Sequence, residues 1–179
     1  MISGPSLHVF VEGPDDERFF DAVVRPRLGA RYSAISCIKY ARTKKDSVTA
    51  MLRALRGSGK QVMFLVDIDL FPCPDERRRD VVSKYGVVVE QEVHVVIKEI
   101  ESWYAAGLDR DGCSGLGLRW RAFRFGTHEL SKEAVYASQI RPDSMTHQQL
   151  LIGMLAAFDY GRAKHANPSF KRFVLQLGI

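Results

Sequence analysis

The sequence has few cysteines and no long hydrophobic run. Its three cysteines, Cys37, Cys73 and Cys113, lie far apart, so neither a disulfide framework nor the close spacing of a zinc site or a redox pair is present. No apolar run approaches the roughly 18 residues that a membrane span requires. The N-terminal residues lack the basic segment and the long apolar run of a signal peptide. We therefore expect free thiols in a cytoplasmic protein that does not associate with membranes.

Internal repeats and low-complexity segments are also absent. The 179 residues are 46% hydrophobic and 26% charged, which is close to the average of soluble globular proteins and excludes collagen-like, coiled-coil and wholly disordered chains. A chain of this length corresponds to one domain and can bury a hydrophobic core without disulfides or metals. We expect a catalytic core over residues 1–110, with residues 111–179 as a mostly helical extension packed on the same domain.

Short apolar runs alternate with segments of helical character. Strands are predicted over residues 7–11, 33–40, 61–66, 87–89 and 93–97. Helices are predicted over residues 14–26, 48–55, 75–85, 100–108, 131–138, 147–157 and 168–177. Pro26 is expected to end or bend the first helix, and the segment 109–117, rich in glycine and aspartate, is typical of a loop. This alternation predicts an α/β fold with a mainly parallel, Rossmann-like sheet flanked by helices, followed by a helical C-terminal part.

Acidic residues follow three of the predicted strands. Glu12 follows the first strand, Asp67 and Asp69 follow the third, and Glu99 and Glu101 follow the strand at residues 93–97. In parallel sheets, functional groups gather outside the carboxyl ends of the strands. A cluster of like charges there is destabilising unless a cation neutralises it or protons are taken up. Because carboxylate oxygens are the ligands that Mg²⁺ and Mn²⁺ prefer, the pattern predicts a divalent-metal site.

The local spacing supports shared ligation. Asp67 and Asp69 are two residues apart, so on an extended chain both side chains point to the same side and can reach one metal ion. Gly13, directly after Glu12, allows a sharp turn and a close approach of a ligand to the backbone. The alternative interpretation is structural. Acids in the segment 15–17 are favourable in the first turn of a helix, and Asp67 and Asp69 are common turn residues.

Two motifs resemble those of the Toprim superfamily. Val-Phe-Val-Glu-Gly-Pro-Asp-Asp-Glu at residues 9–17 is similar to that superfamily's glutamate and glycine after the first strand, and Phe-Leu-Val-Asp-Ile-Asp at 64–69 is similar to its Asp-x-Asp after the third. The glutamate motif looks most like that of the OLD-family nucleases and small stand-alone members, among them small ribonucleases. The segments Lys-Glu-Ile-Glu-Ser-Trp at 98–103 and Ser-Phe at 169–170 also resemble stand-alone Toprim-like proteins.

The resemblance implies specific roles. Glu12 would be the general acid or base or a metal ligand, and Asp67 and Asp69 would be ligands of Mg²⁺ or Mn²⁺. Many Toprim sites have a further acid shortly after the Asp-x-Asp, whereas here Leu-Phe-Pro-Cys-Pro follows at residues 70–74. Glu99 or Glu101 could take that role, and the sequence does not choose between them. Topoisomerase and primase activities are not expected, because 179 residues leave no room for the additional domains that they need.

Basic residues are unevenly distributed in a chain whose net charge is +5. Between residues 39 and 60 there are seven Lys/Arg and one acid, and we expect Lys39, Arg42, Lys44 and Lys45 near a phosphate path. Residues 119–125 interleave three arginines with three aromatics. Arg119, Arg121 and Arg124 are candidate nucleic-acid contacts, because arginine beside stacked aromatics suits phosphates and unstacked bases. The other interpretation of these segments is a solvated face or an edge strand.

The function that follows from the acids and the basic segments together is metal-dependent phosphoryl transfer. We expect a nuclease that acts on DNA or RNA with Mg²⁺ or Mn²⁺ as cofactor. One alternative is a non-catalytic or accessory Toprim-like subunit that binds a protein partner in a larger nucleic-acid-processing or defence system. Another is a phosphohydrolase of small molecules. The sequence does not decide whether the substrate is DNA or RNA, whether cleavage is internal or from an end, or whether one or two metal ions bind. It also leaves open the oligomeric state and whether activity requires a partner.

Overall fold

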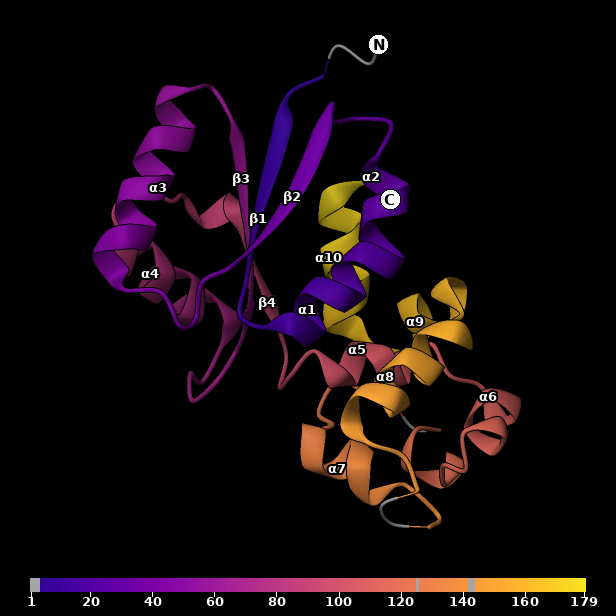
Figure 1. Cartoon of the computed structure of the whole chain (residues 1–179). Coiled ribbons are helices and arrows are strands. Elements are labelled where there is room, and N and C mark those ends of the chain that lie inside the picture. The colour runs from indigo at the N-terminus through magenta and orange to yellow at the C-terminus, as the bar shows by residue number, and fades with distance from the viewer. Residues whose placement is uncertain (1–3, 125, 142–143) are drawn as a thin grey trace. The chain divides into compact units, whose positions relative to one another are not determined.

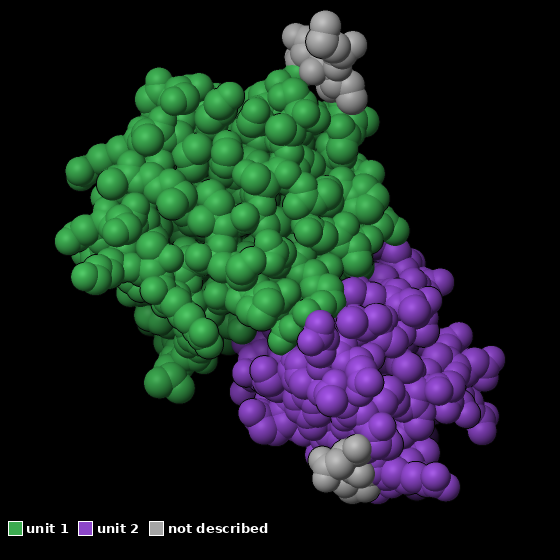
Figure 2. Space-filling view, in the orientation of Figure 1, with its two compact units in different colours: residues 1–95 green, residues 96–179 purple. Residues whose placement is uncertain are grey.

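The chain divides at residue 95 into two units, each with its own buried core. The computed structural model describes residues 4–124, 126–141 and 144–179 (Figure 1). The first unit comprises residues 1–95 and the second residues 96–179 (Figure 2). Within the described ranges, no helix has both the length and the apolar character needed to cross a membrane.

The first unit contains the alternating strands and helices that the sequence predicts. Its elements in chain order are β1 (Ser6–Val11), α1 (Pro14–Phe19), the π-helical segment η1 (Phe20–Val24), α2 (Arg25–Leu28), β2 (Ala34–Lys39), α3 (Lys45–Gly57), β3 (Gln61–Asp67), α4 (Pro74–Tyr85), the 3₁₀ turn η2 (Glu90–Glu92) and β4 (Val93–Val96). The α/β class is thereby confirmed, and the last residue of β4 begins the second unit.

The sheet has four strands in the order β2-β1-β3-β4 and is parallel, as predicted. The central strand β1 pairs with β2 from Ser6↔Ala34 to Val11↔Lys39, and with β3 from Leu7↔Gln61 to Val11↔Leu65. Figure 1 shows α3 and α4 on one side of this sheet and α1 and α2 on the other. The register brings the carboxyl ends of β1 and β3 together, so the residues that follow them meet at one edge of the sheet.

Two local predictions in this unit need correction. The first concerns Pro26, which is expected to end or bend the first helix. The helix does not end there. The Arg25 N–H donates to the Phe20 carbonyl five residues back, and the helical chain continues through Pro26 to Leu28. This π-type turn keeps the chain helical before Pro26, which has no N–H to donate itself.

The predicted strand at residues 87–89 is the second error. These residues, all of which the structure describes, form no strand after the left-handed Gly86, whose φ is 68°. The Val89 N–H donates instead to the Glu92 carboxylate (3.1 Å).

An aromatic cluster forms the core between the sheet and the helices α3 and α4. The Phe10 and Phe64 rings, on neighbouring strands, stack with their centroids 4.7 Å apart. Tyr85 of α4 stacks on Phe64 at 5.5 Å, and the Tyr40 ring meets Tyr85 edge-on at 6.3 Å. All four side chains are buried. Pairs of this kind add about 0.5–1.5 kcal/mol each to the burial of their area, so the cluster gives the adjoining sheet edge a rigid support.

The second unit is helical. Its elements are α5 (Glu101–Ala106), α6 (Arg110–Gly115), the 3₁₀ turn η3 (Trp120–Ala122), α7 (Lys132–Ala137), α8 (His147–Ala156), α9 (Tyr160–Ala166) and α10 (Pro168–Leu177).

The loop predicted at residues 109–117 is wrong, because Asp109 accepts a hydrogen bond from the Gly112 N–H (2.7 Å) and so caps α6. Helix α9 was not predicted. Residues 119–124 form no edge strand but include η3, and Phe125 lies outside the described residues.

Trp103 is fully buried and organises the core of this unit. Its ring meets Phe170 at 5.2 Å and Phe173 at 4.9 Å between centroids. Its Nε1–H donates to Ser169 Oγ at 2.6 Å, so the buried indole nitrogen is satisfied. The Ser-Phe pair at residues 169–170 therefore belongs to the helical core, where it joins α10 to α5.

Candidate functional site: carboxylates around Arg77

Glu12 lies at the carboxyl end of β1, directly beside β3. Its Oε1 accepts hydrogen bonds from the Tyr40 hydroxyl and from the Asp67 backbone N–H, both at 3.3 Å. Tyr40 belongs to the aromatic core, so the carboxylate is held by a rigid group below it and by the end of β3 beside it. The structure thus brings Glu12 and the start of the Asp-x-Asp segment together, although 55 residues separate Glu12 from Asp67.

The two aspartates are not presented by an extended chain. β3 ends at Asp67, and Asp69 has a φ of 52°, in the left-handed region. The Phe71 N–H donates to the Ile68 carbonyl (3.1 Å), so the chain turns at this point. The two-residue alternation of a strand therefore does not apply at Asp69. Aspartate tolerates the left-handed region better than most residues, which makes this turn compatible with the motif.

Arg77 of α4 stands at the centre of the cluster. Its Nη2 lies 3.0 Å from Glu12 Oε1 and 2.8 Å from Asp69 Oδ2, and its Nε donates to the Asp67 carbonyl at 2.9 Å. A further ion pair joins Nη1 to Asp80 at 3.2 Å. The guanidinium also lies over the Phe71 ring, 5.3 Å from its centroid. Only 12% of the Arg77 side chain is exposed, so these contacts are largely shielded from water.

The electrostatics of the cluster follow from this geometry. Burial raises the pKa of Glu12, and the neighbouring Asp69 carboxylate raises it further, whereas Arg77 and the Asp67 N–H oppose the shift. Burial is also the main cause that raises the pKa of Tyr40, with a further contribution from Glu12, so its hydroxyl remains a donor. The net result is a carboxylate whose affinity for a proton is increased, which is the property that a general base requires.

The acids that follow Glu12 have structural partners. Asp16 is buried, and its Oδ2 accepts from the Gly13 N–H at 2.9 Å at the start of α1. Asp15 pairs with Arg18 one turn later on the same helix. Glu17 pairs with Lys39, one of the predicted phosphate contacts. The interpretation of these three acids as residues of the first helical turn therefore agrees with their local contacts.

The other predicted phosphate contacts of the first unit lie after β2. Arg42, Lys44 and Lys45 are all exposed, and Lys45 begins α3. Their exposure leaves them accessible to a solvent-borne phosphate, but in the described part of the chain no hydrogen bond or ion pair fixes their side chains in a defined direction. They are therefore an accessible basic segment rather than a built site.

The remaining candidates belong to the second unit. Glu99 Oε2 accepts from the Lys132 N–H, and the buried Glu101 lies 3.5 Å from both Lys132 Nζ and His147 Nε2. Arg119, Arg121 and Arg124 lie around η3. Within the second unit, Glu99 thus contacts a backbone N–H of α7, and Glu101 contacts a cation of α7 and a histidine of α8.

Sequence reasoning missed Arg77. The available signal was the helix start at Pro74, which follows the Asp-x-Asp segment closely and carries three consecutive arginines at residues 77–79. Nothing local indicates which of the three turns toward the acids. Only the packing of α4 on the sheet selects Arg77, while Arg79 remains exposed.

The donor set of this cluster fits a hard cation. Two carboxylate oxygens, from Glu12 and Asp69, lie within hydrogen-bond distance of Arg77 Nη2. The backbone oxygen of Asp67 accepts a hydrogen bond from Nε of the same guanidinium. An all-oxygen set of this kind suits Mg²⁺ or Mn²⁺. In the arrangement seen here, Arg77 supplies the neutralising charge.

No protein-family model matches this chain. No curated protein matches it either. Among solved structures, the chain is similar to the C-terminal region of the OLD protein of Xanthomonas campestris pv. campestris, with 17% sequence identity and a TM-score of 0.42 over 96% of this chain and 86% of that chain. A likeness at this level assigns neither family nor activity, so the interpretation of the site rests on its own geometry.

Proposed function

We propose that the first unit carries a divalent-metal site that hydrolyses phosphodiester bonds in DNA or RNA. The single observation that supports this most is the convergence of Glu12 and Asp69 on one cationic centre at the carboxyl edge of a parallel sheet. In this proposal Asp67, Asp69 and Glu12 hold Mg²⁺ or Mn²⁺, and Glu12 is also the candidate base. When bound, the metal would polarise a phosphate oxygen and lower the pKa of a water molecule.

The protein's own groups have separable tasks in this proposal. Tyr40 and the Asp67 N–H hold the Glu12 carboxylate in one orientation. Arg77 neutralises the acids before the metal arrives, and afterwards its guanidinium can turn to a phosphate oxygen, which it suits by shape and charge. Glu99 and Glu101 are engaged within the second unit, so the proposal rests on the three acids of the first.

The test combines metal binding with hydrolysis. Mg²⁺ and Mn²⁺ are titrated calorimetrically into the wild type, into D67N/D69N and into D46N, which removes an exposed acid from the first turn of α3 in the same unit. Labelled single- and double-stranded DNA and RNA are then incubated with each protein. We expect binding and cleavage by the wild type and by D46N, and neither by D67N/D69N. Cleavage that survives in D67N/D69N would place the chemistry elsewhere and overturn the proposal.

A second candidate is favoured by Arg77 itself. Because the guanidinium already satisfies Glu12 and Asp69, the cluster is electrostatically stable without a metal, as an accessory Toprim-like subunit would require. This candidate predicts that the wild type does not bind Mg²⁺ or Mn²⁺. It predicts the same for R77M, in which the competing cation is gone. Recovery of a nuclease or an ATPase with the tagged protein would then identify the partner system.

A further inference from the structure

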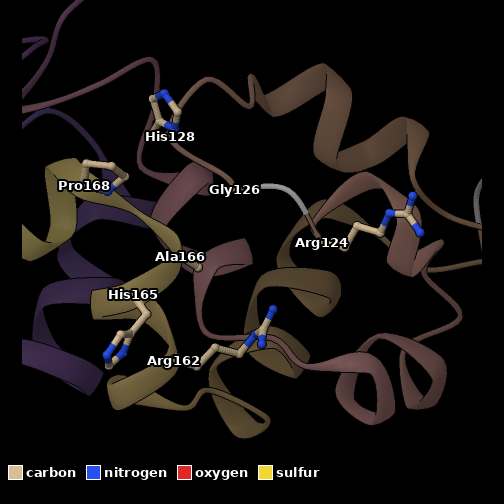
Figure 3. A pocket seen from close by; sticks show the side chains of 7 residues that line it. All are labelled: Arg124, Gly126, His128, Arg162, His165, Ala166 and Pro168. Atoms are coloured by element: carbon tan, nitrogen blue, oxygen red, sulfur yellow. The ribbon is translucent and has the colours of Figure 1, made fainter.

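The second unit contains two pockets that several arginines line. The first has a volume of about 670 Å³ and is lined by Arg124, Gly126, His128, Arg162, His165 and the start of α10. Figure 3 shows that these residues come from two segments, the loop around Gly126 and the helix α9 with the start of α10. In this view the Arg162 guanidinium extends from α9 into the space between the segments, and Arg124 extends away from α9.

The second pocket has a volume of about 610 Å³. Four arginines line it, Arg110, Arg119, Arg121 and Arg124, together with Trp120 and the exposed Ile140. Arg124 lines both pockets, and the Arg162 guanidinium of the first lies over the Trp120 ring of the second, 4.7 Å from its centroid. The two pockets therefore form one continuous feature, which we call the arginine surface: Arg110, Arg119, Arg121, Arg124 and Arg162.

Several contacts hold this surface in shape. Arg162 Nε donates to the Leu108 carbonyl, and its guanidinium lies over the Trp120 ring. Arg119 Nη1 donates to the Ala137 carbonyl at 3.1 Å, and its backbone N–H donates to the Ser138 carbonyl at 2.7 Å. Phe123, between Arg121 and Arg124, is buried and anchors the segment. Because a guanidinium has five N–H donors, Arg119 and Arg162 keep donors for a ligand beyond these internal bonds.

The described walls of the two pockets carry cationic side chains. Among the described residues, no aspartate or glutamate lines either pocket. Two acids close to these arginines in the sequence face helix N-termini: Asp109 accepts from the Gly112 N–H (2.7 Å), and Asp159 from the Arg162 N–H (2.6 Å). A concave surface of one sign of charge concentrates the opposite charge near it. We therefore expect the ligand of these pockets to be an anion.

The geometry favours phosphates on a strand over an isolated small anion. Arginine binds phosphate oxygens through paired N–H donors, and the shared Arg124 places two such sites next to each other. Trp120, half-buried between them, supplies an aromatic edge against which a base can pack. We propose that the arginine surface binds successive phosphates of a nucleic-acid strand, without a requirement for a divalent metal. The choice of nucleic acid as the polymer rests on the proposed function.

The experiment measures binding in the presence of EDTA, where metal-dependent cleavage cannot occur. A fluorescent single-stranded oligonucleotide of about 20 nucleotides, enough to span a typical single-strand site, is titrated with full-length protein, and anisotropy gives Kd. The test variant is R121Q/R124Q. The matched control is K171Q/R172Q, which removes the same charge from exposed positions of α10 in the same unit. The variant R121K/R124K restores charge without the planar donors.

We expect R121Q/R124Q to weaken binding at least about tenfold at low salt. In a plot of log Kd against the logarithm of the salt concentration, the slope should become shallower by about 1.4, because two phosphate contacts are lost. The control should change Kd by less than about twofold, because non-local charges are screened. R121K/R124K should recover part of the affinity. Equal weakening by the test and control variants would show that only net charge matters and would overturn the proposal.

Two further arms separate the possible failures. Inorganic phosphate and a mononucleotide are added as competitors, and displacement by either at the same phosphate concentration as unlabelled oligonucleotide would overturn binding of a strand. D67N/D69N is titrated in EDTA as well, and it should bind the oligonucleotide as tightly as the wild type or more tightly. If the wild type cleaves no nucleic acid but the arginine dependence holds, the proposed function fails and the arginine surface stands.

Discussion

At the scale of single residues, the candidate site is defined by the placement of one arginine. Two carboxylates that share a partly buried edge repel each other and are costly to desolvate. Arg77 reduces this cost for Glu12 and Asp69, because its Nη2 lies within hydrogen-bond distance of both. The same arrangement explains why burial raises the pKa of Glu12 while Arg77 limits the shift.

Replacing Arg77 should therefore destabilise the metal-free protein. We expect R77M to lower the free energy of unfolding by about 2 kcal/mol in EDTA, because charged hydrogen bonds of this kind contribute roughly 1.5–3 kcal/mol. R79M, on the same helix with an exposed side chain, is the control and should change it by less than about 0.5 kcal/mol. Denaturant unfolding with and without Mg²⁺ measures both, and Mg²⁺ should stabilise R77M more than the wild type. Equal stability of R77M and R79M in EDTA would contradict the role assigned to Arg77.

A second prediction at this scale concerns Cys37. Burial, and then the nearby Asp21 carboxylate, raise the pKa of its thiol to about 12. Below that pH the thiol stays protonated, so its alkylation by iodoacetamide at pH 8 should be at least about 100-fold slower than that of a free thiol with an ordinary pKa of about 8.5.

Cys37 Sγ lies 3.5 Å from Asp21 Oδ1, so D21N removes one cause of the raised pKa. Alkylation of Cys37 in D21N should be faster at every pH between 7 and 10, as followed by peptide mass spectrometry. A rate that is unchanged in D21N would mean that burial alone protects the thiol.

At the scale of elements, the two units start their helices in different ways. Each helix from α6 to α10 begins with a side chain that accepts a hydrogen bond from a backbone N–H. In chain order, these side chains are those of Asp109, Ser131, Thr146, Asp159 and Asn167. In the first unit, α1 and α4 begin with a proline in the first turn and have no side-chain cap. Local sequence signals of the capping type therefore account for the starts of α6 to α10, whereas α5 has no side-chain cap.

Asn167 connects several elements through its cap. Its buried side chain accepts from the Phe170 N–H (3.1 Å) and from Ser169 Oγ (2.9 Å). The amide nitrogen donates to Thr127 Oγ1 (3.1 Å) and to the Ser102 carbonyl (3.3 Å). The residue thus fixes the start of α10 against α5 and against the loop that leads to the first pocket.

We expect N167A to lower the free energy of unfolding by about 2–4 kcal/mol, since it removes a cap and leaves buried groups unsatisfied. N167D retains both acceptor functions but loses the donor to Thr127 and Ser102, and it introduces a buried charge. It should therefore destabilise as well, even though the cap is retained. Chemical denaturation measures both variants. If N167D were as stable as the wild type, the contacts of the amide nitrogen would contribute nothing.

At the scale of the whole molecule, charge and stability are divided between two units. The first carries fifteen Lys/Arg and thirteen Asp/Glu, the second eleven and eight, so the net charge of +5 is shared. The acids of the candidate metal site belong to the first unit and the arginine surface to the second. Each unit also has a buried aromatic centre of its own, around Phe64 in one and Trp103 in the other.

Separate cores predict separate responses to destabilisation. Hydrogen exchange followed by mass spectrometry should show that N167A loses protection in residues 96–179, whereas the peptides of β1 and β3 retain theirs. The reason is that the contacts of Asn167 all lie within the second unit. A parallel loss of protection in β1 and β3 would show that the chain opens as one cooperative unit.

Much of this organisation was accessible from local sequence patterns. Apolar runs of strand length predicted all four strands of the sheet, and the helix over residues 168–177 has the predicted bounds. The failures have local causes too. Residues 87–89 are β-branched, but the Glu92 carboxylate accepts from the Val89 N–H, which a strand would need for pairing. The segment 109–117 is rich in glycine, but it contains a helix that Asp109 caps. Competing side-chain hydrogen bonds decided these segments against propensity.

The sequence alone determined that acids follow the ends of parallel strands and that arginines alternate with aromatics near residue 120, because both are patterns of neighbouring residues. Only the tertiary structure decided which groups these side chains meet. Arg77 reaches Glu12 across 65 positions of the chain, and Arg162 stacks on Trp120 across 42. Periodicity records which face of an element is buried, but the partner on that face is selected by packing between elements. That selection places a guanidinium between Glu12 and Asp69 and gathers five arginines on one surface.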